Sequence, residues 1–109
     1  MKNTVKSNRL GESYLRVDHP SGLTMLLCPM KGFSSAYAMF DTKYGSVDTT
    51  FKTDADEDYI TVPEGIAHFL EHKLFESEDG DAFARYAATG ASANAYTSFD
   101  RNAYLFSFT

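Results

Sequence analysis

The chain has 109 residues, of which 43% are hydrophobic and 15% aromatic, so it is long enough for one folded domain with a modest core. Its net charge of −5 gives a nucleic-acid partner no electrostatic support. No apolar stretch follows the basic residues at the N-terminus, and we therefore expect neither a signal peptide nor a membrane span.

Strands are predicted in the first part of the chain. Residues Tyr14–Asp18 alternate in polarity, His19–Gly22 supplies a turn, and Leu23–Cys28 continues as a second strand. Because Cys28 is the single cysteine, it excludes an internal disulfide and favours a reducing compartment, which makes the cytoplasm the expected location. Its apolar neighbours predict that Cys28 is buried.

A third strand and a helix are predicted next. Ser34–Tyr44 has strand character, and the acidic segment Thr49–Asp58 is expected to be an exposed connection. Thr61 can then cap a helix, with Glu64 returning the capping-box contact and a proline in the first turn. This helix is predicted to run to about residue 75.

The last part of the chain predicts one more helix and two strands. The helix is expected at Asp81–Thr89, closed by Gly90, and the strands at Ala93–Ser98 and Ala103–Phe108. The order βββ-αα-ββ predicts an α+β fold, an antiparallel sheet with helices packed on one face. Since residues 103–109 contain no charge and no proline, we expect this strand to leave an open edge, and the chain to self-associate through a sheet edge or through the uncovered sheet face.

An H-x-x-E-H string, formed by His68, Glu71 and His72, lies in the predicted first helix. Residues four apart on a helix lie about 40° apart around the axis and roughly 6 Å along it, so the two histidines point the same way. Glu71 lies about 60° to the other side of His68 and flanks such a site. Two imidazoles beside a carboxylate suit a Zn²⁺ ion with a general base.

The same three residues can also arise by chance in a helix. An amphipathic pattern argues against this, because the apolar residues fall on an arc roughly opposite the histidines and predict a buried back for the helix. That arc contains Ile66, Phe69, Leu70 and Leu74.

Two segments resemble the pitrilysin/insulinase family of zinc metallopeptidases. Residues 65–75 resemble its G-x-x-H-x-x-E-H-x-x-F helix, and residues 90–97 its G-x-x-x-N-A-x-T strand. Residues 101–104 and the N-terminal hairpin extend the resemblance over nearly the whole chain. The helix sequence is most like that of bacterial cytoplasmic members.

The resemblance implies a zinc-dependent metalloendopeptidase that hydrolyses peptide bonds of extended peptides. His68 and His72 correspond to zinc ligands, and Glu71 to the base that activates a zinc-bound water. Asn94, Ala95 and Thr97 match the edge strand against which a peptide substrate pairs.

One ligand of the family pattern is missing from the chain. The resemblance implies a downstream glutamate as third zinc ligand, and no glutamate follows Asp81. Glu76, Glu78 and Asp79 are nearer but are expected to be solvated. We therefore expect residues 1–109 to be the N-terminal portion of a truncated metallopeptidase domain that is inactive alone.

Two other hypotheses for the function of the whole protein compete with the peptidase. One is a non-catalytic peptide-binding or assembly subunit of the same family, against which the intact His68, Glu71 and His72 argue. The other is a globular domain with a coincidental H-x-x-E-H, which does not explain the matching strand at residues 94–97. A homo- or heterodimer with a family member is the expected assembly, and neither nucleic acid nor a membrane is expected as a partner.

Overall fold

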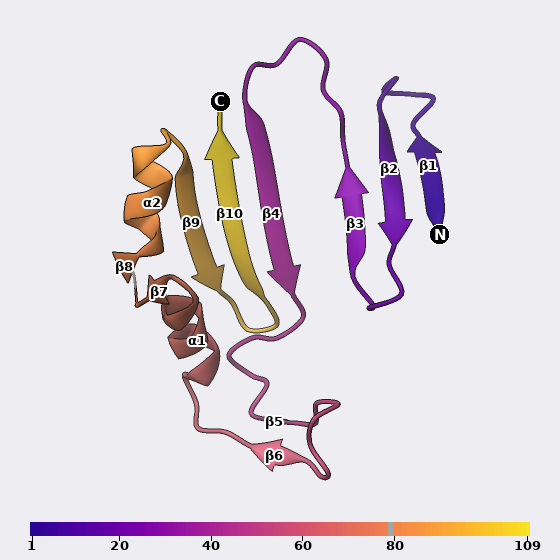
Figure 1. The fold of residues 1–109 in the computed structure, drawn as a ribbon. Coiled ribbons are helices and arrows are strands. Elements are labelled where there is room, and N and C mark those ends of the chain that lie inside the picture. Colours follow the sequence, from indigo (N-terminus) through magenta and orange to yellow (C-terminus); the bar gives the residue numbers. More distant parts are fainter. Residues whose placement is uncertain (79) are drawn as a thin grey trace. The chain divides into compact units, whose positions relative to one another are not determined.

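The computed structural model describes residues 1–78 and 80–109, and these form an α+β fold of antiparallel sheets and two helices (Figure 1). The chain divides into two compact units, Met1–Phe33 and Ser34–Thr109. Among the described residues, no helix combines the length and the apolar character needed to cross a bilayer.

The first unit is a single three-stranded antiparallel sheet in the order β1-β2-β3. Its strands are β1 (Lys2–Lys6), β2 (Ser13–Asp18) and β3 (Thr24–Leu27). The hairpin from β2 to β3 agrees with the sequence, whereas β1 was not predicted. Cys28 is exposed, contrary to the prediction, because this unit has one sheet layer and no second layer to bury residues that follow β3.

The second unit is built on another antiparallel sheet, in the order β4-β10-β9 (Figure 1). Its strands are β4 (Ala36–Thr42), β9 (Ser92–Thr97) and β10 (Asn102–Phe108). The last strand is therefore central, and the prediction that β10 presents an open edge is wrong. A long-range pairing with β4, which sequence alone does not reveal, covers its second side, so the edges of this sheet are β4 and β9.

Two short hairpins lie outside that sheet. One pairs β5 (Thr50–Phe51) with β6 (Ile60–Thr61), and the other pairs β7 (Glu76–Ser77) with β8 (Gly80–Asp81). Neither hairpin was predicted, since strands of two residues carry no periodicity. The segment between β5 and β6 remains an exposed acidic connection, as expected.

The motif helix α1 (Ile66–Leu74) begins later than predicted. Thr61 belongs to β6, and its hydroxyl contacts that of Thr50 instead of capping a helix. The N-cap is Gly65, whose φ of 89° places it in the left-handed region that only glycine adopts without strain. The pairing of β6 with β5 thus overrides the local capping signal.

The second helix, α2 (Ala82–Ala88), agrees with the prediction. The Asp81 carboxylate accepts a hydrogen bond from the Phe83 amide at 2.9 Å, as a helix cap does. At the other end, Gly90 has a φ of 74° and the next amide donates to the Tyr86 carbonyl oxygen.

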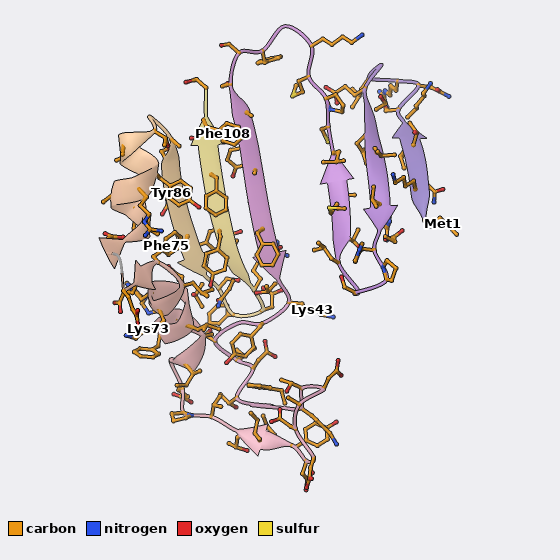
Figure 2. The ribbon with its side chains drawn as sticks, viewed as in Figure 1. Met1, Lys43, Lys73, Phe75, Tyr86 and Phe108 are labelled. Atoms are coloured by element: carbon orange, nitrogen blue, oxygen red, sulfur yellow. The ribbon has the colours of Figure 1, made fainter. Side chains whose placement is uncertain are left out.

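Both helices contact β9, and aromatic side chains fill the space between them and the sheet. Figure 2 shows Phe75 and Tyr86 on this side of the sheet. Phe75 stacks on Phe83 with ring centroids 4.3 Å apart and also contacts Tyr104, which is 6% exposed. This small aromatic core fixes the end of α1.

The side of α1 that was predicted to be buried is not the side that packs on the sheet. Phe69, Leu70 and Leu74 are 58%, 41% and 60% exposed. The helix contacts the sheet through Ala67, which is 3% exposed, because a small side chain allows close approach of the two backbones. The apolar arc consequently lies to one side of the contact and the histidines to the other.

The connection after β4 packs on the turn between β9 and β10. The amides of Ser46 and Val47 donate to the carbonyl oxygens of Ser98 and Phe99. Gly45 is buried there, and a Cβ on it would lie 2.4 Å from the Phe99 oxygen. Only glycine permits this approach, which secures the end of β9 nearest α1.

Candidate metal centre

His68 and His72 lie one turn apart on α1 with their rings directed at one another. Their Nε2 atoms are 3.1 Å apart, and the ring planes are inclined by 63°. A tetrahedral Zn²⁺ with Zn–N bonds of about 2.05 Å separates two ligand nitrogens by about 3.3 Å. The two imidazoles are therefore placed to chelate one zinc ion with little movement.

The Glu71 carboxylate completes this cluster. One ligand atom from each of His68, Glu71 and His72 lies within 4.8 Å of the others. Glu71 is half-buried between α1 and the sheet, whereas both histidines are exposed. The arrangement offers two nitrogen ligands on the open side and a carboxylate beside them.

Thr97 on β9 holds the carboxylate of Glu71. Its Oγ1 donates a hydrogen bond to Oε2 of Glu71 at 2.5 Å. The hydrogen bond joins residues 26 positions apart, so it exists only because α1 lies on β9. A hydrogen bond to an ionised carboxylate is stronger than one between neutral groups.

Two residues of β10 lie beneath the same helix. Nδ2 of Asn102 donates to the carbonyl oxygen of Ala67 at 3.0 Å, and Asn102 is 1% exposed. Burial raises the pKa of the Tyr104 hydroxyl, and the negative charge of Glu71 raises it further. Tyr104 thus remains a neutral phenol beside the carboxylate.

Asn102 was missed as a site residue, although the sequence contains a signal for it. It falls in phase with Tyr104 and Phe106 on β10, the side that faces the helices. A polar residue in phase with a buried apolar face needs a hydrogen-bond partner, which here is the motif helix.

The three predicted substrate-binding residues lie on β9, which is an edge strand as expected. Asn94 is exposed on the face away from α1, while Ala95 and Thr97 are half-buried on the face toward it. Only Thr97 reaches the cluster on α1 with its side chain.

The open side of β9 presents backbone groups of alternate residues. The Ser98 amide donates to the Arg101 carbonyl oxygen, so this pair is hydrogen-bonded across the turn. Continuing the antiparallel alternation, Ala93, Ala95 and Thr97 direct their N–H and C=O groups away from β10. One of these groups is occupied, because Oδ1 of Asn94 accepts from the Ala95 amide at 2.9 Å.

Of the nearby carboxylates predicted to be solvated, Glu76 and Glu78 do not join the cluster. Glu76 pairs with Lys73 at 2.8 Å, and this contact lowers the pKa of its carboxyl group. Glu78 is exposed, and Asp79 lies outside the described residues. His19 belongs to the first unit, where its Nδ1 is 2.7 Å from the Ser21 hydroxyl in the predicted turn.

Comparison with known proteins identifies the family. The model of the insulinase family, peptidase family M16, matches residues 55–109, which include the whole histidine–glutamate cluster and β9. The chain belongs to the insulinase family. The predicted family and the predicted α+β architecture are thereby confirmed.

Relatives of this insulinase-family chain are much longer than it is. The uncharacterized zinc protease YmfH of Bacillus subtilis (strain 168) is 49% identical over all 109 residues, which are 26% of its own length. The crystal structure of an M16-like peptidase from Alicyclobacillus acidocaldarius superposes with a TM-score of 0.73 at 45% identity. The chain is fully covered in that comparison and spans 22% of that structure's chain.

Proposed function

We propose that this chain supplies two zinc ligands and the catalytic base of a metalloendopeptidase. The observation that carries the proposal is the convergence of the two histidine Nε2 atoms to 3.1 Å beside the Glu71 carboxylate. His68 and His72 would hold Zn²⁺, and Glu71 would act on water. The name of YmfH, a zinc protease, supports zinc as the cofactor.

The chemistry assigned to Glu71 is proton transfer. When bound, zinc would polarise the scissile carbonyl and lower the pKa of the attacking water. Glu71 takes a proton from that water while the oxygen of the water bonds to the carbonyl carbon. It then delivers the proton to the leaving amine as the C–N bond breaks.

The substrate we propose is an extended peptide paired along β9. Ala95 and Thr97 would bind it through the backbone groups on the open side of the strand, and Asn94, whose backbone groups face β10, through its side-chain amide, so recognition would depend little on peptide sequence. An incoming peptide carbonyl would replace Oδ1 of Asn94 on the Ala95 amide. The position of β9 beside α1 supports delivery of the peptide to Glu71.

We further propose that the site is completed by residues outside this chain. Catalytic zinc sites have three protein ligands and one open position, whereas the described residues group two histidines with a base. The chain spans about a quarter of the length of YmfH. It would then be the N-terminal portion of a peptidase domain, inactive alone and active in the full-length protein.

Replacing Glu71 with Gln in the full-length protein tests this assignment. Hydrolysis of an unstructured peptide should fall at least about 100-fold, the range for losing a general base, while zinc content stays stoichiometric. His68→Ala should lose the zinc itself. If Glu71→Gln loses zinc to the same extent as His68→Ala, Glu71 is a ligand and not the base.

The same experiment addresses the alternative of a non-catalytic peptide-binding or assembly subunit. Such a subunit would contain no stoichiometric zinc and would not hydrolyse the peptide. We propose a cytoplasmic location, which the unpaired Cys28 supports. A homo- or heterodimer with another family member is the proposed assembly.

A further inference from the structure

The hydroxyl of Thr97 makes a hydrogen bond within the protein. It lies on the face of β9 that α1 covers and donates to Oε2 of Glu71. Its Cα partner across the sheet is Asn102, whose side-chain amide donates to Ala67 on the same helix. One rung of the sheet therefore contacts both the backbone of the motif helix and the carboxylate that the helix carries.

This geometry limits the freedom of the Glu71 side chain. A glutamate has three rotatable side-chain bonds and, when unattached at a surface, samples many rotamers. Thr97 is β-branched and restricted at χ1 in a strand, so it is a stiff donor. Because Oε2 accepts the Thr97 hydroxyl, Oε1 is the carboxylate oxygen left to act on a water at the cluster, in which the ligand atoms of Glu71 and the two histidines lie within 4.8 Å of one another.

We propose that Thr97 is a positioning residue for Glu71, and this inference rests on the proposed function of Glu71 as the base. The hydroxyl of Thr97 keeps one carboxylate oxygen on the sheet so that the other meets the attacking water. Thr97 would then bind the substrate through its backbone groups alone. Its side chain acts on the chemical step and its backbone on binding.

The turn that follows Thr97 is itself secured. Gly45 packs so closely against the Phe99 backbone that a Cβ at position 45 would clash with it. The Ser46 amide also donates to the carbonyl oxygen of Ser98. The donor therefore stands next to a backbone segment held from outside the hairpin. A firmly held donor is what positioning of a reacting group requires, because small displacements cost rate.

Three variants of the full-length protein test the inference kinetically. Thr97→Val keeps the shape and removes the donor, and kcat should fall about tenfold to 100-fold while KM changes less than about twofold. Thr97→Ser restores the hydroxyl and should recover most of kcat. Thr42→Val is the matched control, since Thr42 occupies the same rung and its hydroxyl donates to the Asn102 carbonyl oxygen at 3.4 Å.

Zinc content should be unchanged in all three variants. A rise in KM with kcat preserved in Thr97→Val would overturn the inference, because it would make the hydroxyl a substrate contact. An equal loss of kcat in Thr42→Val would also overturn the inference, because the loss would then follow from removing any hydroxyl on that rung.

A thermal unfolding cycle on the zinc-free 109-residue chain tests the contact without activity. Thr97→Val should lower Tm by about 5 °C in the native background and by much less once Glu71→Ala has removed the acceptor. Equal shifts in both backgrounds would overturn the inference. Absence of zinc-dependent hydrolysis in the unmodified protein would instead refute the proposed function, so the two failures are distinguishable.

Discussion

The side-chain amide of Asn102 donates to the carbonyl oxygen of Ala67 across 3.0 Å, which ties the central strand to the helix that carries both histidines. Asn102 is buried, and its NH₂ group must face Ala67, because a carbonyl oxygen can only accept a hydrogen bond.

Replacing Asn102 with Asp should destabilise the chain. The change removes the donor at constant shape and places a buried carboxylate against the Ala67 oxygen, at a cost of about 3 kcal/mol in the free energy of unfolding. Urea unfolding of the chain measures it. Asn94→Asp is the matched control, because Asn94 is exposed and uses its oxygen as an acceptor, which aspartate retains.

Replacing Gly45 with Ala should be similarly damaging. The added Cβ would lie 2.4 Å from the Phe99 oxygen and 2.5 Å from the Asp100 nitrogen, both backbone atoms that cannot rotate away. Overpacking of this kind costs about 3 kcal/mol. Gly32→Ala should cost only about 1 kcal/mol, because a Cβ there meets nothing within 4 Å and adds only the strain of a positive φ. Equal urea midpoints for the two variants would contradict the close approach.

Zinc binding by the 109-residue chain should be weak. Two imidazoles leave the remaining positions to water, so the apparent binding free energy should be smaller than the roughly 10 kcal/mol of a complete structural site. Titration against a chromophoric chelator measures this. His72→Ala should abolish binding and His19→Ala should leave it intact, since His19 serves a turn in the first unit. Tight one-to-one binding would show that another group completes the site.

The first unit should lose stability in acid through Asp18. Hydrogen bonds from Arg16 and Thr24 hold the pKa of its carboxyl below the usual value of 3.8. A lowered pKa in the folded state means that the contribution is fully present above that value and disappears as pH falls through the lowered pKa. The protection of the β2 and β3 amides against hydrogen exchange, taken relative to the intrinsic exchange rate at each pH, should fall below about pH 4. Asp18→Asn should remove this step, and an unchanged profile would rule out Asp18 as its source.

Self-association is still expected, but through β4 and not through β10. The edge strand β4 exposes the apolar side chains of Tyr37, Met39 and Phe40, and its one charged residue, Asp41, lies near its end and pairs with Arg101. Light scattering of the chain at high micromolar concentration should show dimers or larger species. Met39→Lys should shift the chain toward monomer, whereas Ser92→Lys on the opposite edge should have less effect. A clean monomer in the unmodified chain would contradict this expectation.

Local signals predicted much of the fold. Alternation located β2, β9 and β10 to within one residue, and Asp81 with Gly90 delimited α2. These signals depend on neighbours in sequence, which a single chain displays directly.

Features that depend on distant pairing were not predictable in this way. The start of α1 was misplaced because β6 pairs with β5 eleven residues away. The hydrogen bond from Thr97 to Glu71 required knowing that α1 lies on β9, and Thr97 could be predicted only as part of a peptide-binding strand. The relation of Glu71 to the histidines, by contrast, follows from helical spacing alone.

The alternation of backbone groups along β9 has a consequence for cleavage patterns. Ala93, Ala95 and Thr97 offer their polar backbone groups on the open side, two residues or about 6.8 Å apart. A peptide shifted along this edge by one residue would turn every side chain to the opposite face, whereas a shift of two preserves each contact. Because the backbone hydrogen bonds re-form after either shift, only a substrate whose side chains alternate in polarity should give initial fragments that differ in length by even numbers of residues.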